Sequence, residues 1–398
     1  MNRNILDVWA GTSLAGKLLH EQQRKYVFTY GEDSADTVSL TMPLRMESWV
    51  SHELHPVFQM NLPEGALLEA IREAIAKIVG DDDISLLTVT GGNQIGKNQF
   101  VRSGESPSEQ PDNIESLSEI LAYPDTTELF HELVNRYAMR SGVSGVQPKI
   151  LLDAQKRGTL AAHKYIVKSS GDDYPHLAAN EFFCMTAAQR AGLPVHPFYL
   201  AENGGLFVMQ RFDISDNDNK LGFEDMCSLM GVGTRQKYRG TYERIAKALR
   251  AFISSSSLPQ ARKQFFATLV LSSMVRNGDA HLKNFGVLYE SAQTEVSIAP
   301  VYDIVTTAAY IHSDVPALSI DGRKKWWPRK MLEKYARDHL FLTNKEIAQI
   351  IEQTAEAVAK TRSDIADYMV NHPDFSEIGG KMMACWEEGM QDFSHKER

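Results

Sequence analysis

The stretch RNGDAHLKNF, residues 276–285, carries the strongest structural signal in the chain. It follows residues 259–274, whose apolar side chains cover a wide helical face and predict a buried helix with Pro259 in its first turn. The strand-like segment Gly286–Tyr289 comes directly after it. Polar groups this dense are costly beside a core unless they have partners or a task. The stretch is therefore the first candidate for a functional site.

Asp279 and Asn284 have the D-x-x-x-x-N spacing of catalytic loops that transfer phosphoryl groups. In such loops the Asp accepts the proton of the acceptor hydroxyl and the Asn binds Mg²⁺. Asp303 follows the strand-like Val296–Ile298, where these enzymes place a second Mg²⁺ ligand, although no Phe-Gly follows it here. Each residue has a structural alternative: Asp279 and Asn284 could bond backbone amides in a helix-capping loop, and Asp303 could cap the next helix.

Lys168 ends the alternating strand expected over His163–Lys168. A Lys at that place could reach nucleotide phosphates, or it could simply be solvated. Glu181 lies on the helix expected over Ala178–Ala191, where it could pair with Lys168 or be an ordinary exposed residue.

The segment SGVSGVQPK, residues 141–149, precedes a strand expected over Ile150–Leu152. Its small residues would let backbone amides approach phosphate oxygens. It matches neither G-x-G-x-x-G nor a Walker A sequence, so a plain turn remains an alternative.

Two further features admit functional interpretations. The basic and aromatic segment Arg323–Lys330 could contact nucleic acid or an acidic protein, or it could be a solvated loop with its tryptophans packed inward. His281 beside Asp279 could belong to a metal-dependent hydrolase, but no second His lies at ligand spacing.

The rest of the pattern places strands early and helices late. Tyr26–Tyr30 and Thr37–Met42 predict strands, and Asn61–Leu86 predicts a helix. The polar residues 102–116 are the best candidate linker, and Thr343 with Glu346 has capping-box spacing. This order favours a two-lobed α+β enzyme.

Composition narrows the class of protein. The 398 residues suffice for two or three folding units, and 43% of them are hydrophobic. The net charge of -9 argues against broad non-specific binding to nucleic acid. The three cysteines lie far apart, and no run is apolar and long enough for a membrane span or a signal peptide. We therefore expect a cytoplasmic protein without a membrane partner.

With these motifs in order, the chain resembles the HipA family of bacterial toxin kinases. The resemblance is carried by segments spread over nearly the whole chain: Tyr26–Pro43, Pro56–Gly65, Gly145–Lys149, Lys168, Asn180-Glu181, Met209–Asp213, Phe223–Cys227, Asn277–Phe285 and Pro300–Asp303.

The resemblance implies a two-lobed protein-kinase-like fold. An N-terminal subdomain would cover residues 1–105, an α/β N-terminal lobe with the phosphate loop 106–250, and an all-helical C-terminal lobe 251–398. It also implies ATP and Mg²⁺ as cofactors, with Asp279 as the catalytic base and Asn284 and Asp303 as the metal ligands. The implied nucleotide-binding residues are Val143, Ser144, Gly145, Val146, Gln147, Lys149, Lys168, Gln210, Phe212, His281 and Lys283.

The family also suggests partners. Its members phosphorylate aminoacyl-tRNA synthetases, which arrests translation, and many are neutralised by a small helix-turn-helix antitoxin that contacts DNA. A nucleotide-binding corepressor acting with such an antitoxin is the alternative function. Some members autophosphorylate a loop serine, but Gly142 occupies that place here, with Ser141 and Ser144 as the nearby candidates.

Overall fold

The computed structural model describes residues 5–21, 25–64, 68, 71, 82–107, 114–137, 147–156, 161–171 and 173–394. The chain divides into two units, each assembled from segments distant in sequence. Unit 1 comprises Met1–Ser169, Val208–Gln236 and Gly286–Val296. Unit 2 comprises Ser170–Phe207, Lys237–Phe285 and Ser297–Arg398.

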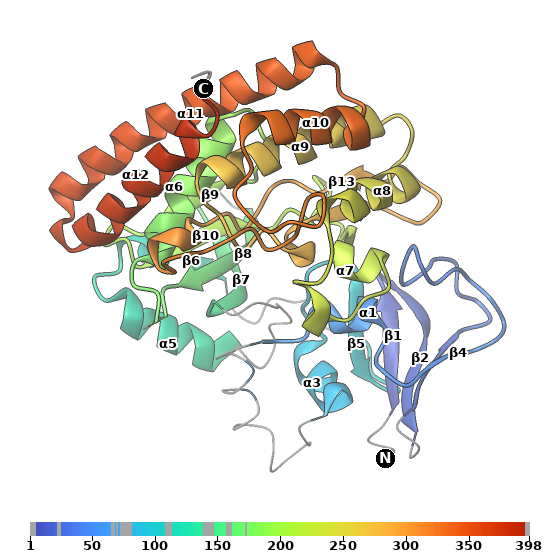
Figure 1. Ribbon diagram of the computed structural model, residues 1–398. Coiled ribbons are helices and arrows are strands. Elements are labelled where there is room, and N and C mark those ends of the chain that lie inside the picture. Colours follow the sequence, from blue (N-terminus) through green and yellow to red (C-terminus); the bar gives the residue numbers. More distant parts are fainter. Residues whose placement is uncertain are drawn as a thin grey trace. The chain divides into compact units, whose positions relative to one another are not determined.

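Unit 1 begins with an antiparallel sheet of order β4-β3-β2-β1-β5 (Figure 1). Its strands are β1 (Ile5–Ala10), β2 (Ser13–Glu21), β3 (Lys25–Tyr30), β4 (Trp49–Ser51) and β5 (Asn98–Arg102). The short helices α1 (Pro56–Gln59) and α3 (Asp83–Thr90) complete this part of the unit. Alternate residues of each strand point to one face of the sheet. The core on that face includes Val8, Phe28 and Phe100 from three strands, together with Phe58 from α1.

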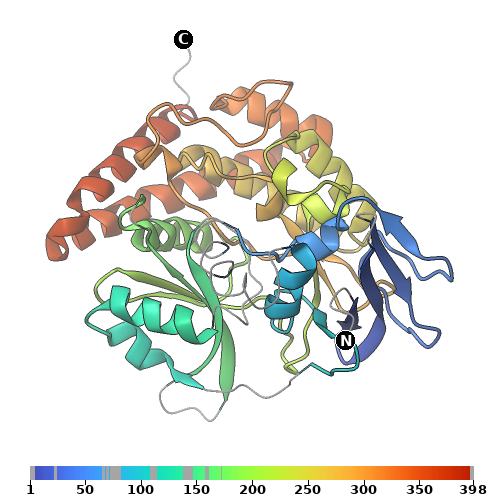
Figure 2. The same ribbon diagram turned by 90° about the horizontal axis from the view of Figure 1, so that it is seen from below.

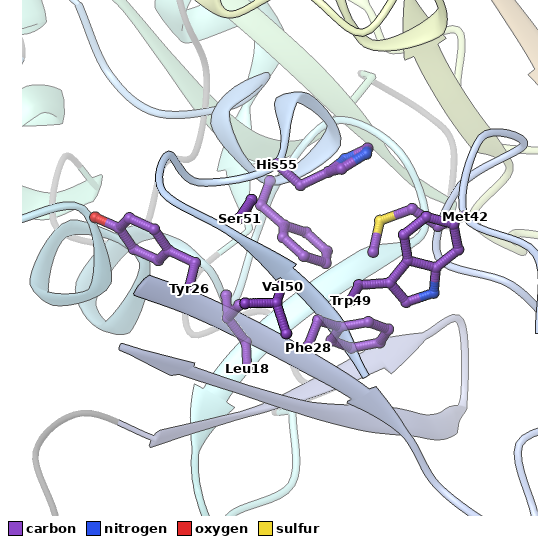
Figure 3. A pocket seen from close by; sticks show the side chains of 9 residues that line it. Leu18, Tyr26, Phe28, Met42, Trp49, Val50, Ser51 and His55 are labelled. Carbon is purple, nitrogen blue, oxygen red and sulfur yellow. The ribbon is translucent and has the colours of Figure 1, made fainter. Parts of the chain in front are cut away.

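A small apolar pocket opens within this first part of unit 1 (Figure 3). It is lined by Leu18, Tyr26, Phe28, Met42, Trp49, Val50, Ser51, His55 and Phe58. His55 is the N-cap of α1, and its ring Nδ1 accepts from the Val57 amide at 3.3 Å. Burial lowers the pKa of His55 to about 4, so the imidazole is neutral at pH 7.

A second sheet in unit 1 carries several predicted site residues. Its strands β6 (Glu115–Ser116), β7 (Lys149–Gln155), β8 (Ala162–Ser169) and β10 (Leu206–Gln210) are adjacent in that order. The helices α4 (Leu117–Ala122) and α5 (Thr126–Tyr137) precede β7, and α5 packs against it (Figure 2, teal). The strand β11 (Gly222–Asp225) pairs with β12 (Gly286–Tyr289) and leads into α7 (Met226–Leu229) and a 3₁₀ turn, η2 (Thr234–Gln236).

Unit 2 is mostly helical. Its helices are α6 (Leu177–Arg190), α8 (Tyr242–Phe252), α9 (Leu258–Met274), α10 (Arg329–Leu340), α11 (Asn344–Asn371) and α12 (Ser376–Gln391). The segments between these helices contain two short strands, β9 (Phe198–Leu200) and β13 (Ser297–Ile298). They also contain three 3₁₀ turns, η3 (Leu282–Asn284), η4 (Thr307–Ala309) and η5 (Pro373–Phe375). The buried helix α9 contacts α6, α8, α10, α11 and α12 (Figure 1). The predicted Pro259 start of α9 and the Thr343–Glu346 capping box of α11 are confirmed.

The predicted strand over Thr37–Met42 is wrong, because its backbone groups bond to side chains instead of a neighbouring strand. The Val38 carbonyl accepts from Asn98 Nδ2 at 2.8 Å, and the Leu40 amide donates to the buried Glu224 carboxylate at 2.6 Å. The helix predicted over Asn61–Leu86 is also wrong at its start, because residues 61–64 are not helical. Most residues after these lie outside the described ranges, and α3 begins at Asp83, capped by the Asp82 side chain.

In the segment Arg323–Lys330, the inward-packing interpretation is confirmed for Trp327, which is 2% exposed. Among the described residues, no helix is both long and apolar enough to cross a membrane.

Candidate active site

The end of α9 sets the position of the predicted catalytic loop in unit 2. The helix is capped at Val275, and Arg276 adopts a left-handed backbone conformation with φ 56°. The Arg276 guanidinium donates to the Asp392 carboxylate at 2.9 Å and lies over the Trp326 ring. The Asn277 amide still bonds to the Ser272 carbonyl at 2.8 Å. The chain therefore leaves the buried helix through an anchored turn.

Asp279 stands at the centre of the loop. Its amide donates to Asn277 Oδ1 at 3.0 Å, and its carbonyl accepts from the His281 amide at 2.7 Å. Its carboxylate Oδ1 accepts from the Tyr238 hydroxyl at 2.6 Å and lies 3.9 Å from His281 Nε2. The Asp279 side chain is 38% exposed, so its carboxylate is accessible to solvent although Tyr238 bonds to it.

Asn284 and Asp303 lie beside Asp279. The Asn284 Nδ2 atom donates to the Asp279 carbonyl at 2.8 Å and approaches the Asp303 carbonyl at 3.5 Å. This fixes the amide and leaves its oxygen as the group with ligand chemistry. The Tyr302 hydroxyl donates to the Lys283 carbonyl at 2.6 Å, which ties the two segments together. Unit 2 thus brings together Asp279, His281, Lys283, Asn284 and Asp303.

Other residues occupy the N-cap positions of the two 3₁₀ turns in this region. The N-cap of η3 is His281, and the N-cap of η4 is Thr306. Neither Asp279 nor Asp303 takes that place. Asp303 instead has a left-handed φ of 61°. A carboxylate and an amide oxygen are hard ligands that suit Mg²⁺ together with phosphate oxygens, so the donor set fits that ion.

Gly278 packs closely against the side chains of Thr307 and Asp314. Its amide donates to Thr307 Oγ1 at 2.6 Å, and the Thr307 hydroxyl bonds to the Asp314 carboxylate. A Cβ atom at residue 278 would lie 2.1 Å from Asp314 Oδ2. The close packing of these groups therefore fixes the backbone immediately before Asp279.

Unit 1 gathers the predicted phosphate-binding residues on neighbouring strands. Lys149 in β7 is the register partner of Lys168 in β8, and the two residues are 6% and 3% exposed. Partners in antiparallel strands place their side chains on the same face. Gln147 Nε2 donates to the Ser169 carbonyl at 3.2 Å, beside this pair. Lys168 is therefore buried rather than solvated, and two ammonium groups on one face suit an anionic ligand.

The predicted adenine-binding residues flank a buried ion pair. Arg211, between Gln210 and Phe212, bonds to Asp213 through Nε–Oδ1 at 2.9 Å and Nη2–Oδ2 at 2.6 Å. The Gly96 amide donates to the same carboxylate at 2.6 Å. Burial alone would raise the pKa of Asp213, but Arg211 and the Gly96 amide hold it below its usual range. Phe212 packs against Phe223 with ring centroids 5.3 Å apart.

Some predicted residues stay untested by geometry. Ser141, Val143, Ser144, Gly145 and Val146 lie outside the described residues. Glu181 is fully buried, so the exposed alternative is wrong for it. Lys168 and Glu181 belong to different units, and their pairing stays a prediction.

Sequence reasoning missed three residues that shape the site. They are Tyr238, which bonds the Asp279 carboxylate, and the pair Thr307 and Asp314, which holds Gly278. Tyr238 lies 41 residues before Asp279, and no motif joins them. Its only sequence signal is an aromatic residue among basic neighbours in Arg235–Arg239.

The chain matches two known family models. The HipA N-terminal domain family matches residues 6–101, and the HipA-like C-terminal domain family matches residues 141–362, more than half of the chain. Y4mE of Sinorhizobium fredii, named as a candidate kinase, is 27% identical and covers 93% of this chain and 95% of its own. Y4dM of the same organism, named likewise, is 28% identical over 68% of this chain and 66% of its own.

A solved structure shares the fold. It comes from Shewanella oneidensis MR-1 and holds the toxin–antitoxin system HipA and HipB with operator DNA. It matches 97% of this chain and 97% of its own chain with a TM-score of 0.67 at 19% identity. The predicted kinase-like α+β fold is confirmed by this match. The family matches show that the chain belongs to the HipA family of kinases.

Proposed function

We propose that this chain transfers the γ-phosphoryl group of ATP to a serine or threonine hydroxyl of a protein. A kinase family implies the use of a nucleotide, and ATP with Mg²⁺ is the donor that the site chemistry suits. The observation that carries the proposal is the anchored loop in which Asp279, Asn284 and Asp303 converge.

Each residue has a defined role in this proposal. The acceptor oxygen bonds to the γ-phosphorus, the bond to the ADP oxygen breaks, and Asp279 takes the acceptor proton. Asn284 Oδ1 and the Asp303 carboxylate would hold Mg²⁺, which neutralises charge on the phosphates. Lys149 and Lys168 would bind the phosphates, with His281 and Lys283 lining the site.

The remaining nucleotide contacts would come from two segments, residues 210–212 and residues 143–147. Gln210 and Phe212 would hold the adenine. Gln147 and residues 143–146 would cover the phosphates with backbone amides, a place where phosphate on Ser144 or Ser141 would add negative charge beside ATP.

The biological role proposed is that of a toxin. The Shewanella protein is a HipA found with HipB and operator DNA, which supports a small DNA-binding antitoxin as a partner here. DNA contact would then be indirect. A cytoplasmic translation enzyme, such as an aminoacyl-tRNA synthetase, is the proposed substrate, and its phosphorylation would arrest growth.

The decisive experiment compares the native chain with Asp279→Ala. A general base typically contributes about 10²–10⁴-fold in rate, so phosphoryl transfer and growth arrest should fall by that order while ATP binding survives. Asp338→Ala is the matched control, because Asp338 is an exposed carboxylate on α10. Phosphoproteomics after brief expression of each form would identify the acceptor. Equal transfer by the native and Asp279→Ala chains would refute the proposal.

A further inference from the structure

Tyr238 is held against the catalytic loop at several points. Its hydroxyl donates to Asp279 Oδ1 at 2.6 Å, and its ring meets the His281 ring edge-to-face with centroids 4.9 Å apart. Its carbonyl accepts from Lys324 Nζ at 3.2 Å. The preceding carbonyl, that of Lys237, accepts from the Leu282 amide at 3.2 Å. The backbone of residues 237–238 is therefore tied to Leu282 and Lys324, which places the phenol beside Asp279.

Tyr238 makes these contacts although its side chain is largely open to solvent. The residue is 43% exposed, and holding an exposed side chain in one rotamer costs conformational entropy. A hydrogen bond from a phenol to an ionised carboxylate is stronger than a neutral one and offsets that cost. The bond also restricts rotation of the Asp279 carboxylate, whereas the hydrogen bonds of the Asp279 amide and carbonyl hold only the backbone.

We infer that Tyr238 is a positioning residue for the phosphoryl acceptor, holding the Asp279 carboxylate in one orientation while its exposed surface receives the acceptor hydroxyl. This inference rests on the proposed function, because it gives Asp279 the role of base. It goes beyond that function in assigning a task to a residue outside the catalytic stretch.

Three basic side chains lie near the hydrogen bond between Tyr238 and Asp279. His281 Nε2 lies 3.9 Å from Asp279 Oδ1, and Lys237 Nζ lies 5.6 Å from the centre of the Tyr238 ring. Lys324 reaches the Tyr238 carbonyl from the segment after β13. These groups remain in a Tyr238→Phe variant, which removes one donor to the carboxylate and keeps the ring.

The test measures phosphoryl transfer from Mg-ATP to a degenerate serine/threonine peptide mixture, and ATP hydrolysis with water as acceptor, at neutral pH. Tyr238→Phe should lower turnover about 10-fold, since a bond to a charged group contributes on that order. The KM for Mg-ATP should stay unchanged.

Tyr137→Phe is the matched control. The Tyr137 hydroxyl donates to the Glu115 carboxylate at the same 2.6 Å, but in α5 of unit 1. This variant should behave as the native chain does. Thermal unfolding of each variant separates loss of function from loss of folding.

The outcomes distinguish the two ideas. If the native chain transfers no phosphate, the proposed function and this inference fall together. If the native chain is active and Tyr238→Phe keeps its turnover, Tyr238 has no positioning role. A fall in turnover together with a raised KM for Mg-ATP would assign Tyr238 to nucleotide binding and also overturn the inference.

Discussion

Removing either partner of the Arg211–Asp213 pair should strongly destabilise unit 1. Arg211 and Asp213 are 1% and 0% exposed, so each substitution leaves a buried charge without its main partner. Breaking such a pair from one side costs about 3–5 kcal/mol, a large part of a typical unfolding free energy of about 5–15 kcal/mol. We therefore expect Asp213→Ala to lower the urea midpoint markedly.

Removing both partners of the pair should destabilise unit 1 less than removing one of them. In the double variant Arg211→Met with Asp213→Leu, neither charge of the pair remains, but the Gly96 amide loses its acceptor and the Gln94 carbonyl loses its donor. An unsatisfied buried donor costs about 1–3 kcal/mol, so the double variant should be more stable than either single one. Arg136→Met is the control, because Arg136 pairs with Glu115 with its side chain 45% exposed. Such a surface pair contributes about 1 kcal/mol or less.

The sign of the pH dependence gives a sharper test. In the native chain the pKa of Asp213 is lowered, so its contribution is present above the unfolded pKa near about 4 and is lost as pH falls below it. Without Arg211, burial dominates and raises that pKa above the unfolded value. The Arg211→Met variant should then lose stability, relative to the native chain, as pH rises from about 4 toward 7.

Urea unfolding at several pH values measures this difference, and hydrogen exchange of peptides containing Gly96 reports the local bond. Two results would refute the reasoning. One is an Asp213→Ala cost no larger than that of Arg136→Met. The other is an Arg211→Met stability profile parallel to the native one between pH 4 and 7.

Two further predictions concern the metal ligands and the first sheet. Asn284→Ala and Asp303→Ala should weaken ATP binding more with Mg²⁺ than with EDTA, since both remove oxygen ligands; calorimetric titrations giving equal losses would make them structural. Burial lowers the pKa of His55 to about 4, so unfolding free energy should fall by up to about 2–3 kcal/mol as pH drops from about 6.5 to 4. His55→Asn keeps a cap acceptor and should flatten that slope in urea melts; an unchanged slope would place the titrating group elsewhere.

The sequence predicted the elements whose signals are local. The α9 helix, the α11 capping box and the strands β3, β8 and β12 each follow from periodicity and caps within a short window. The Asp279–Asn284 spacing also predicted two residues that lie together, because both belong to one loop.

What the sequence missed depends on contacts between distant segments. The Thr37–Met42 segment has strand-like alternation, yet Glu224 and Asn98 take its backbone groups. Tyr238 reaches Asp279 only because Lys237 and Leu282 meet in the fold. No local pattern encodes such pairs, so they appear only once the chain is folded.

The left-handed backbone of Asp303 has an evolutionary consequence. Holding a non-glycine residue at φ 61° costs on the order of 1 kcal/mol, which glycine would avoid. Selection for heat resistance alone should therefore favour glycine at position 303 and discard the carboxylate. A laboratory population evolved without any demand for toxicity should accumulate that replacement, whereas a population in which the kinase must act should retain the acid and find its stabilising changes elsewhere.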